Sequence, residues 1–340
     1  MKIRFLLLGW VMLAHPLWVQ AASENRPLVI AHRGASGYLP EHTLPAKALA
    51  YGMGADLIEQ DVVLSKDRVP VVLHDIHVDT TTDVATRFPD RHRADGRYYA
   101  LDFTVAELKQ LRVTERISIK TGKAVFPHRF PPKMSSFQIS TLAEELEFIA
   151  GLNQSTGRRV GIYPEIKQPF WHRQQGYDLS SAVLAVLDRF HYRSKDDPCW
   201  LQCFEYPEIK RLREELAWRG RLILLVGTAK TGENGTDYEE LTSDAGLQRL
   251  SKEVDGIGPP LSRVMTWSQS SPGRPALSNL VQRAHACGLR VHPYTVRKDE
   301  LPSGCPSLDA LHAALFSEAK VDGVFTDFPD LTGNWLRHEK

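Results

Sequence analysis

The chain has 340 residues, of which 42% are hydrophobic and 24% are charged, and this composition excludes a collagen-like, coiled-coil or largely disordered protein. Its 42 Lys and Arg residues nearly balance its 41 Asp and Glu residues, and the net charge of +1 argues against a protein that binds the phosphate backbone of nucleic acids. Its four cysteines are too few for a disulfide scaffold.

Residues 1–21 have the pattern of a secretory signal peptide. A basic start precedes an apolar run over residues 5–19, and Ala21 ends a small-x-small cleavage site. We therefore expect cleavage after Ala21, a mature chain of residues 22–340 and a periplasmic location. The apolar run is shorter than the roughly 20 residues that span a membrane. No cysteine follows it to carry a lipid, so we expect no stable membrane anchor.

An exported protein can form disulfides. Cys199 and Cys203 lie on one expected strand, and residues four apart on a strand are roughly 13 Å apart, too far for a disulfide bond. Cys287 and Cys305 could pair, and free buried thiols are the alternative.

From residue 28 onward, short apolar segments alternate with amphipathic ones. This alternation is typical of βαβ units around a parallel sheet. We expect strands at residues 28–32, 56–64, 69–74, 160–167, 200–204, 222–226, 256–258, 291–296 and 323–326. We expect helices at residues 43–53, 179–190, 207–216, 243–253, 277–287 and 308–319.

Nine candidate strands are one more than an eightfold barrel needs. The turn at residues 66–68 is too short for a parallel crossover, so residues 69–74 should fold back antiparallel as a hairpin. Eight strands remain, which predicts an α/β protein with a TIM (β/α)₈ barrel. A doubly wound sheet is the alternative, although no GxGxxG motif follows the first strand.

Residues 76–159 interrupt the alternation and are rich in Arg, Asp, Pro and aromatic residues. They contain two helical segments, at residues 105–111 and 141–152. A connection of this length indicates a small domain inserted within the barrel.

Three strand ends carry charged side chains that a barrel would bring to one mouth. Such residues are rarely buried unless they are paired or bind a metal. The set comprises His32, Arg33, Glu59, Asp61, His74, Glu165 and Lys167.

The spacing within this set predicts contacts. Glu59 and Asp61 are two residues apart on a strand and therefore point to one face. A hairpin that is symmetric about residues 67 and 68 places His74 opposite Asp61, at a Cα separation of about 5.5 Å.

Carboxylates gathered at one mouth repel each other, and a hard divalent cation with oxygen ligands relieves this repulsion. Ca²⁺ or Mg²⁺ fits better than Zn²⁺, because no cysteine or pair of histidines converges with them. His32 and His74 are then available for proton transfer. Arg33 and Lys167 match an anionic substrate that contains phosphate.

Several motifs occur in a specific order over nearly the whole mature chain, at residues 32–43, 59–61, 72–75, 163–167, 292–296 and 323–329. In this order and spacing the chain resembles the glycerophosphodiester phosphodiesterases, specifically the secreted periplasmic bacterial type. The resemblance implies a TIM barrel with an insertion after the hairpin. It also implies hydrolysis of deacylated phospholipids to sn-glycerol 3-phosphate and an alcohol.

The resemblance also assigns roles to individual residues. By the family's pattern there is an acid–base pair (His32 and His74), a set of ligands for one metal ion, commonly Ca²⁺ (Glu59, Asp61 and Glu165), two cations that hold the phosphate (Arg33 and Lys167), and a substrate pocket lined by Gln202, Phe204 and Tyr294. The chain departs from the pattern at His42, where Asn is common, and at Cys203, where a small hydroxyl residue is common.

Two other functions fit the same fold. A phospholipase-type barrel would act on membrane phosphodiesters, but the polar, mixed-charge insertion favours a small soluble substrate. A surface protein that has lost activity would bind partners without turnover, but the complete set of site residues argues against that loss. The oligomeric state stays open, with a dimer as one possibility.

Overall fold

The computed structural model describes residues 26–268 and 271–338, so the expected signal peptide lies outside the described residues. Eight parallel strands form a sheet in the order β10-β7-β6-β5-β4-β2-β1-β11, and β3 (Pro70–Val72) pairs antiparallel with β2. The eight are β1 (Leu28–Ala31), β2 (Leu57–Leu64), β4 (Gly161–Ile166), β5 (Trp200–Cys203), β6 (Arg221–Leu225), β7 (Gly256–Gly258), β10 (Arg290–Val291) and β11 (Gly323–Thr326).

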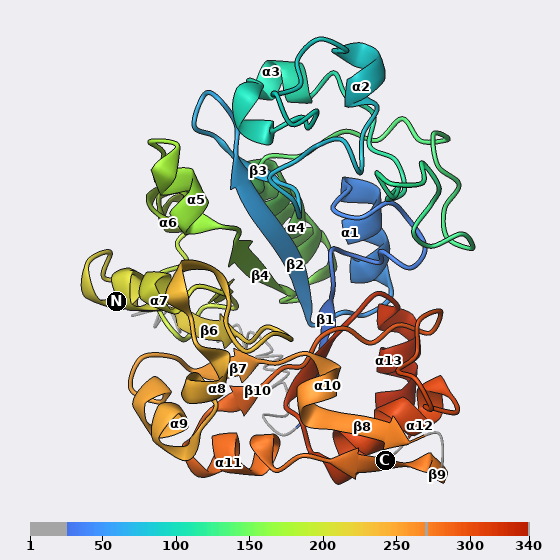
Figure 1. Cartoon of the computed structure of the whole chain (residues 1–340), viewed down its shortest axis with the longest axis vertical. Coiled ribbons are helices and arrows are strands. Elements are labelled where there is room, and N and C mark those ends of the chain that lie inside the picture. Colours follow the sequence, from blue (N-terminus) through green and yellow to red (C-terminus); the bar gives the residue numbers. More distant parts are fainter. Residues whose placement is uncertain (1–25, 269–270, 339–340) are drawn as a thin grey trace, which may run out of the picture.

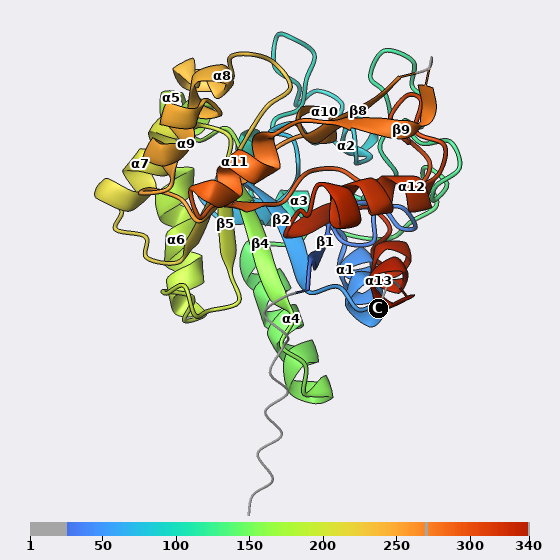
Figure 2. The same cartoon turned by 90° about the horizontal axis from the view of Figure 1, so that it is seen from below.

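The sheet curls into a barrel that is nearly closed, with helices around it (Figures 1 and 2). The two end strands approach each other: the Phe325 amide donates to the Pro293 carbonyl at 3.0 Å, and Val296 bridges Thr326 in parallel. The predicted α/β TIM barrel and its antiparallel extra strand are therefore confirmed. The expected strand at residues 291–296 is shorter in the structure, since its second half makes only isolated bridges.

Helices occur at each of the expected places, with shorter bounds in most. The longer ones, when the π-helical turn Ala313–Glu318 is counted with α12, are α1 (Leu44–Gly52), α4 (Leu142–Thr156), α6 (Leu179–Arg189), α7 (Tyr206–Glu214), α9 (Asp244–Leu250), α11 (Leu280–Ala286), α12 (Leu308–His312) and α13 (Pro329–His338). The short ones are α2 (Val84–Arg87), α3 (Val105–Leu108), α5 (Pro169–Gln174), α8 (Tyr238–Leu241) and α10 (Leu261–Val264). The helix expected to begin at residue 277 begins at Leu280, because the unexpected hairpin β8 (Met265–Ser268) and β9 (Ser271–Leu277) precedes it.

The predicted register of the β2–β3 hairpin is wrong by one residue. Val62 pairs with Val72, and the Leu73 amide donates to the Asp61 carbonyl at 2.9 Å, so Leu73 and not His74 lies opposite Asp61. The turn has three residues between Ser65 and Val69, whose amide and carbonyl are bonded at 3.1 Å. Its last residue, Arg68, has a φ of 65°. The turn is therefore centred on residue 67, and not midway between residues 67 and 68 as predicted.

The segment that carries α2 and α3 lies at the end of the barrel toward which β2 points (Figure 1). Its apolar side chains form a cluster of their own that includes Phe103, Leu108 and Leu111 and rests on Val63 of β2. Helix α4 contributes its buried face to the main core instead, like the other barrel helices. The prediction that residues 76–159 form an inserted domain stays a prediction.

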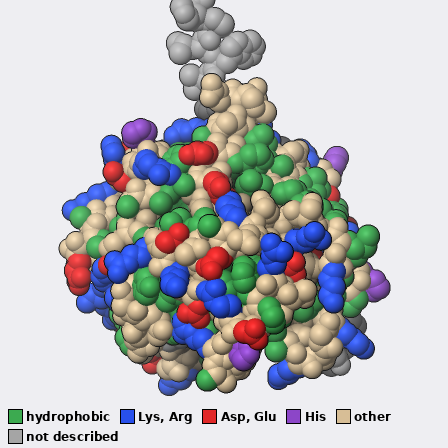
Figure 3. Space-filling view, turned by 90° about the horizontal axis from the view of Figure 1, so that it is seen from above, with side chains coloured by type: hydrophobic (Ala, Val, Ile, Leu, Met, Phe, Trp, Pro, Cys, Tyr) green, Lys and Arg blue, Asp and Glu red, His purple; other side chains and the backbone are tan. Residues whose placement is uncertain are grey.

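The outer surface mixes charges, in line with the net charge of the sequence. Basic and acidic side chains are interspersed over the face drawn in Figure 3. Among the described residues, no helix is both long enough and apolar enough to cross a membrane. Cys287 and Cys305 are free thiols in this structure, as are the buried Cys199 and Cys203.

Candidate active site

A pocket of about 270 Å³ opens at the carboxyl ends of the barrel strands and gathers every site residue expected from the sequence. These are His32, Arg33, Glu59, Asp61, His74, Glu165, Lys167, Gln202, Phe204 and Tyr294. Leu225, Thr295, Arg297 and Phe325 also line it and were not expected there. Residues from strands far apart in the chain meet here because parallel strands end at the same side of a barrel.

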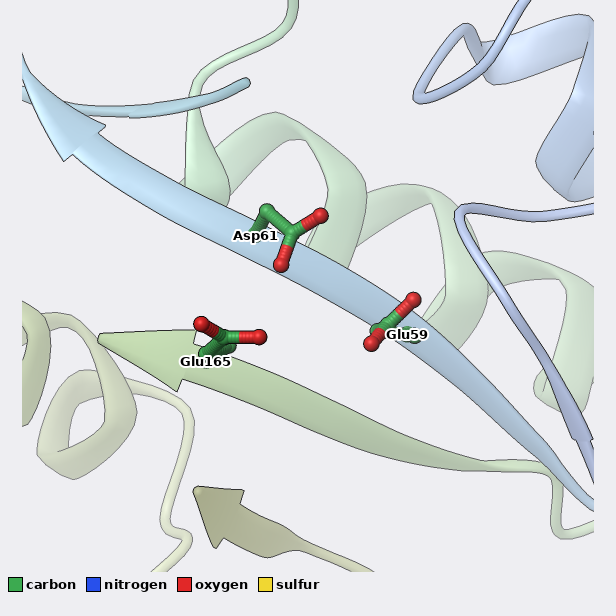
Figure 4. A group of neighbouring side chains, drawn as sticks. All are labelled: Glu59, Asp61 and Glu165. Carbon is green, nitrogen blue, oxygen red and sulfur yellow. The ribbon is translucent and has the colours of Figure 1, made fainter. Parts of the chain in front are cut away.

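The three carboxylates come from two neighbouring strands. Glu59 and Asp61 lie two apart on β2, and the parallel register of β2 with β4 puts Asp61 beside Glu165. All three are buried and point toward one another (Figure 4), and one oxygen atom of each lies within 4.8 Å of one oxygen atom of the other two. The alternation of side chains along a strand thus builds the cluster directly from the sequence.

The electrostatics of this cluster fit a divalent cation. Burial, together with the charges of Asp61 and Glu165, raises the pKa of Glu59 well above its ordinary value. Burial also raises the pKa of Glu165, to about 8, against the pull of Lys167. The Asp61 Oδ1 atom is buried without a hydrogen-bond partner among the described residues. A set of crowded, purely oxygen donors suits a hard cation such as Ca²⁺ or Mg²⁺.

Two cations flank the carboxylates. The Lys167 ammonium lies 2.6 Å from Glu165 Oε1 and 3.7 Å from Asp61 Oδ1. The Arg33 guanidinium lies 3.5 Å from Asp61 through Nε and donates through Nη1 to Glu41 at 3.1 Å. Burial opposes ionisation of Asp61, but the charge of Lys167, followed by His74 and the hydrogen bond from His42, holds its pKa well below the ordinary value. Asp61 is therefore the carboxylate that stays charged without a bound cation.

Both expected catalytic histidines are held in the same way. His32 Nδ1 lies 2.6 Å from Asp327 Oδ1, and His74 Nδ1 lies 2.6 Å from Asp75 Oδ1. The pKa values of both aspartates fall far below normal, although burial opposes this, because each faces its histidine and at least one arginine. An ionised carboxylate can only accept, so each Nδ1 carries the hydrogen and each Nε2 holds the free lone pair.

The environment keeps both rings neutral. Burial, followed by the charge of Arg33, lowers the pKa of His32 to about 4. Burial, followed by Arg33 and Lys167, lowers the pKa of His74 to about 4 as well. Two neutral imidazoles with defined tautomers therefore face one pocket, and each can accept a proton at Nε2.

The three remaining expected residues line the pocket wall. Gln202 Nε2 donates to Glu59 Oε1 at 3.1 Å, which orients this carboxylate. The Phe204 and Tyr294 rings pack edge to face with their centroids 6.0 Å apart. Because the Tyr294 hydroxyl donates to the Val226 carbonyl, at 2.8 Å, Tyr294 contributes its ring rather than its hydroxyl to the pocket.

His42, at a position where the sequence departs from the family pattern, supports Asp61. Its Nε2 lies 2.7 Å from Asp61 Oδ2, and the buried Lys47 ammonium lies 3.2 Å from its Nδ1. Lys47 can only donate, so Nδ1 accepts and the Nε2 hydrogen is directed at Asp61. The hydrogen bond from His42 thereby fixes Asp61 Oδ2, and Asp61 Oδ1 is left to face Glu165.

Sequence reasoning missed the residues that hold the site together. Asp75 stood beside His74 in one motif, Asp327 lay within another, and Glu41 lay within the motif at residues 32–43, so motif membership was an available signal for these three. No local pattern marked the arginines that support the two aspartates from elsewhere. They are Arg116, Arg129 and Arg297.

The comparisons with known proteins agree with this geometry. Residues 32–331 match the Glycerophosphoryl diester phosphodiesterase family. The chain belongs to this family. It is 41% identical over 330 residues to a glycerophosphodiester phosphodiesterase of Haemophilus influenzae, covering 92% of this chain and 91% of that protein. It is 38% identical over 332 residues to one of Treponema pallidum, covering 93% of each chain. Membership confirms the predicted family and enzyme class.

Solved structures of the family share the fold. A putative glycerophosphoryl diester phosphodiesterase from Silicibacter pomeroyi superimposes with a TM-score of 0.69 at 22% identity, over 93% of this chain and 94% of that one. A phosphodiesterase from Oleispira antarctica, solved in complex with the product sn-glycerol-3-phosphate, gives a TM-score of 0.61 at 23% identity, over 92% and 97% of the chains. These likenesses support the barrel assignment.

Proposed function

We propose that this member of the phosphodiesterase family hydrolyses glycerophosphodiesters, the deacylated phospholipids, to sn-glycerol 3-phosphate and an alcohol. The observation that carries the proposal is one pocket lined by two histidines, each bonded to an aspartate behind it, together with three buried carboxylates and two cations. The product that the Oleispira antarctica phosphodiesterase holds is in line with this substrate class.

Glu59, Asp61 and Glu165 would hold one divalent cation, for which we propose Ca²⁺, with Mg²⁺ as the alternative. The ligand set consists of oxygen atoms only, and the negative charges of the three carboxylates, when all are ionised, exceed the two positive charges of Arg33 and Lys167. When bound, the cation would neutralise charge on the phosphate oxygens as it builds up in the transition state.

The two histidines then divide the proton transfers. One Nε2 removes the proton from the attacking oxygen, which belongs either to the glycerol 2-hydroxyl or to water. The other histidine takes up a proton from solvent before this step and donates it to the oxygen of the leaving alcohol. Asp75 and Asp327 keep each ring in the tautomer that this exchange needs. The geometry serves both modes of attack with the same pair.

Arg33 and Lys167 would bind the phosphate from two sides of the carboxylates. Lys167 Nζ lies 5.7 Å from the centroid of the Phe204 ring, so one side of the ammonium faces this ring. The Phe204 and Tyr294 rings give the pocket an apolar wall next to these cations. A charged phosphodiester with a small organic substituent fits such a pocket.

The lowered pKa values of the two histidines predict where kcat/KM falls at low pH. A group with a lowered pKa keeps its neutral, proton-accepting form to lower pH than an ordinary histidine. The histidine that acts as the base has a pKa of about 4, whichever of the two it is, so we expect the acid limb of kcat/KM, where the base becomes protonated, to lie below about pH 6. Measurements with glycerophosphocholine between about pH 4 and pH 8 test this. A fall centred at or above about 6.5, the ordinary histidine value, would contradict it.

A substrate panel separates the proposed function from its two rivals. We expect the purified protein to release choline and sn-glycerol 3-phosphate from glycerophosphocholine and to act on glycerophosphoethanolamine as well. Cleavage of phosphatidylcholine vesicles in preference to these soluble diesters would indicate the phospholipase-type enzyme. Absence of turnover on every substrate, with cation present, would indicate the binding protein and overturn the proposal.

We also propose that the protein is exported to the periplasm. The support is the signal-peptide pattern of residues 1–21. We expect the mature protein in the periplasmic fraction with its first residue at Ala22. N-terminal sequencing of the native protein provides the measurement, and a mature chain that still begins with Met1 would overturn export.

A further inference from the structure

The segment between β3 and α4 reaches back into the site with two arginines, Arg116 and Arg129. Both come from a stretch without helices or extended strands, and both lie with their side chains largely buried against the barrel. The stretch is fixed by its own contacts: Ile117 bridges Ala124, and the Val113 amide donates to the Phe137 carbonyl. These contacts within the inserted segment fix the backbone that carries the two guanidinium groups.

Arg116 binds the aspartate that orients His74. Its Nη1 donates to Asp75 Oδ2 at 2.6 Å, while the other oxygen of Asp75 accepts from His74 Nδ1. Its Nη2 and Nε donate to the two oxygens of Glu41, at 2.6 and 2.9 Å. Glu41 in turn accepts from Arg33 at 3.1 Å. One guanidinium from the insertion therefore fixes both the partner of a histidine and the partner of a phosphate-binding cation.

Arg129 repeats this arrangement at the other histidine. Its Nη2 donates to Asp327 Oδ2 at 2.8 Å, while Asp327 Oδ1 accepts from His32 Nδ1. Its Nε and Nη2 also bond both oxygens of Asp299, at 2.8 and 3.0 Å. Asp75 and Asp327 thus each accept from a histidine through one oxygen and from an arginine of the insertion through the other.

We propose that Arg116 and Arg129 are positioning residues, through which the inserted segment orients the two histidine–aspartate pairs of the barrel. This inference rests on the proposed function of the histidines. A carboxylate with only one fixed oxygen can rotate, and the imidazole bonded to it then no longer points at the oxygen that reacts. Misplacement of a reacting group by about 1 Å can lower the rate by about 100-fold.

The two arginines differ in how much they are needed. Asp327 Oδ2 also accepts from Arg297 of the barrel, at 2.8 Å, so this aspartate keeps a second arginine when Arg129 is removed. Among the described residues, Asp75 Oδ2 has, besides Arg116, only the weaker bond from the Thr80 hydroxyl at 3.2 Å. The loss of Arg116 therefore has the larger effect.

Turnover of glycerophosphocholine by Arg116→Ala, Arg129→Ala and a matched control tests the proposal. The control is Arg97→Ala, which removes an arginine of the same segment from the two oxygens of the nearly buried Asp79, both at 2.8 Å, away from the pocket. We expect kcat to fall about 10- to 100-fold for Arg116→Ala and severalfold for Arg129→Ala, with smaller changes in KM. We expect Arg97→Ala to keep the wild-type kcat.

Chemical rescue distinguishes positioning from mere loss of structure. Guanidinium chloride, well below denaturing concentration, should restore part of the kcat of Arg116→Ala and none in the control, because the free ion can occupy the vacated site between Glu41 and Asp75. If Arg116→Ala does not fold, Arg116→Gln, which keeps the side-chain stem, serves in the same assay.

The outcomes separate this inference from the proposed function. An active wild type with Arg116 and Arg129 variants that match the Arg97 control overturns the positioning role alone. A loss of kcat in the Arg116 variant that guanidinium does not relieve overturns it too. A wild type without turnover overturns the proposed function itself.

Discussion

We expect His32→Ala and His74→Ala each to lower kcat on glycerophosphocholine by about 10²- to 10⁴-fold, the range for a well-placed acid or base. Each histidine is held at Nδ1 by an aspartate and offers Nε2 to the pocket. Because the two act in one exchange of protons, the double variant should be scarcely slower than either single variant. Steady-state kinetics on the three variants provide the measurement.

Folding should survive both changes, which keeps the kinetic test clean. Without His32, Asp327 remains bonded to Arg129 and Arg297. Without His74, Asp75 remains bonded to Arg116. Neither variant leaves an unpaired buried carboxylate, and we expect melting temperatures near that of the wild type.

His285→Ala is the matched control for the histidine variants. His285 also pairs with an aspartate, Asp322 at 2.8 Å, but on the side of the barrel where the strands begin. Its variant should keep the wild-type kcat. If His74→Ala turned over glycerophosphocholine like this control, the acid–base assignment would be wrong.

We expect Glu59→Gln to weaken Ca²⁺ binding at least about 10-fold, a loss typical when a supporting group of a metal site is removed, and to lower kcat sharply. Gln keeps the size of the side chain and an oxygen to accept from the Arg33 amide, which bonds Glu59 Oε2 at 2.8 Å. The substitution removes the charge and leaves the two other carboxylates. Calorimetric titration of the chelated protein with Ca²⁺ provides the measurement.

Stability gives an independent readout of the same substitution. Burial, together with the charges of Asp61 and Glu165, raises the pKa of Glu59, so its charged form is disfavoured when no cation is bound. The chelated Glu59→Gln protein should therefore melt no lower than the chelated wild type. The rise in melting temperature on adding Ca²⁺ should shrink, since a ligand that binds more weakly stabilises the folded protein less at the same concentration. An equal rise in both proteins would remove Glu59 from the metal site.

The carboxylate cluster could be predicted from the sequence because it depends on local periodicity. Side chains two apart on a strand share a face wherever the strand goes, so Glu59 and Asp61 required no knowledge of the tertiary fold. Placing Glu165 beside them required only that parallel strands end at one side of a barrel. The resemblance to the family added Gln202, Phe204 and Tyr294, and the structure places all three in the pocket.

The hairpin register could not be predicted in this way. It depends on Arg68 adopting a left-handed backbone, with a φ of 65°, and arginine carries no local preference for that conformation. His74 nevertheless reaches the pocket, because it follows the end of β3 and is not tied to the alternation of the strand. The prediction that His74 and Asp61 lie at the same site is therefore correct, although the predicted pairing of β2 with β3 is wrong.

The supporting arginines were beyond sequence reasoning for a different reason. Arg116 and Arg129 lie in a segment without helical or strand periodicity, and their partners are 41 and 198 residues away in the chain. Only the path of the insertion over the barrel decides which carboxylate each guanidinium meets.

The most direct measurement of the central claim is a phosphorus NMR time course of glycerophosphocholine with exhaustively chelated protein, before and after Ca²⁺ is added. Three buried carboxylates that need a cation, beside two neutral histidines, predict no change in the chelated sample. They predict conversion to sn-glycerol 3-phosphate once Ca²⁺ is present. Full conversion by the chelated protein would contradict the metal site, and no conversion after addition of either Ca²⁺ or Mg²⁺ would contradict the proposed hydrolysis.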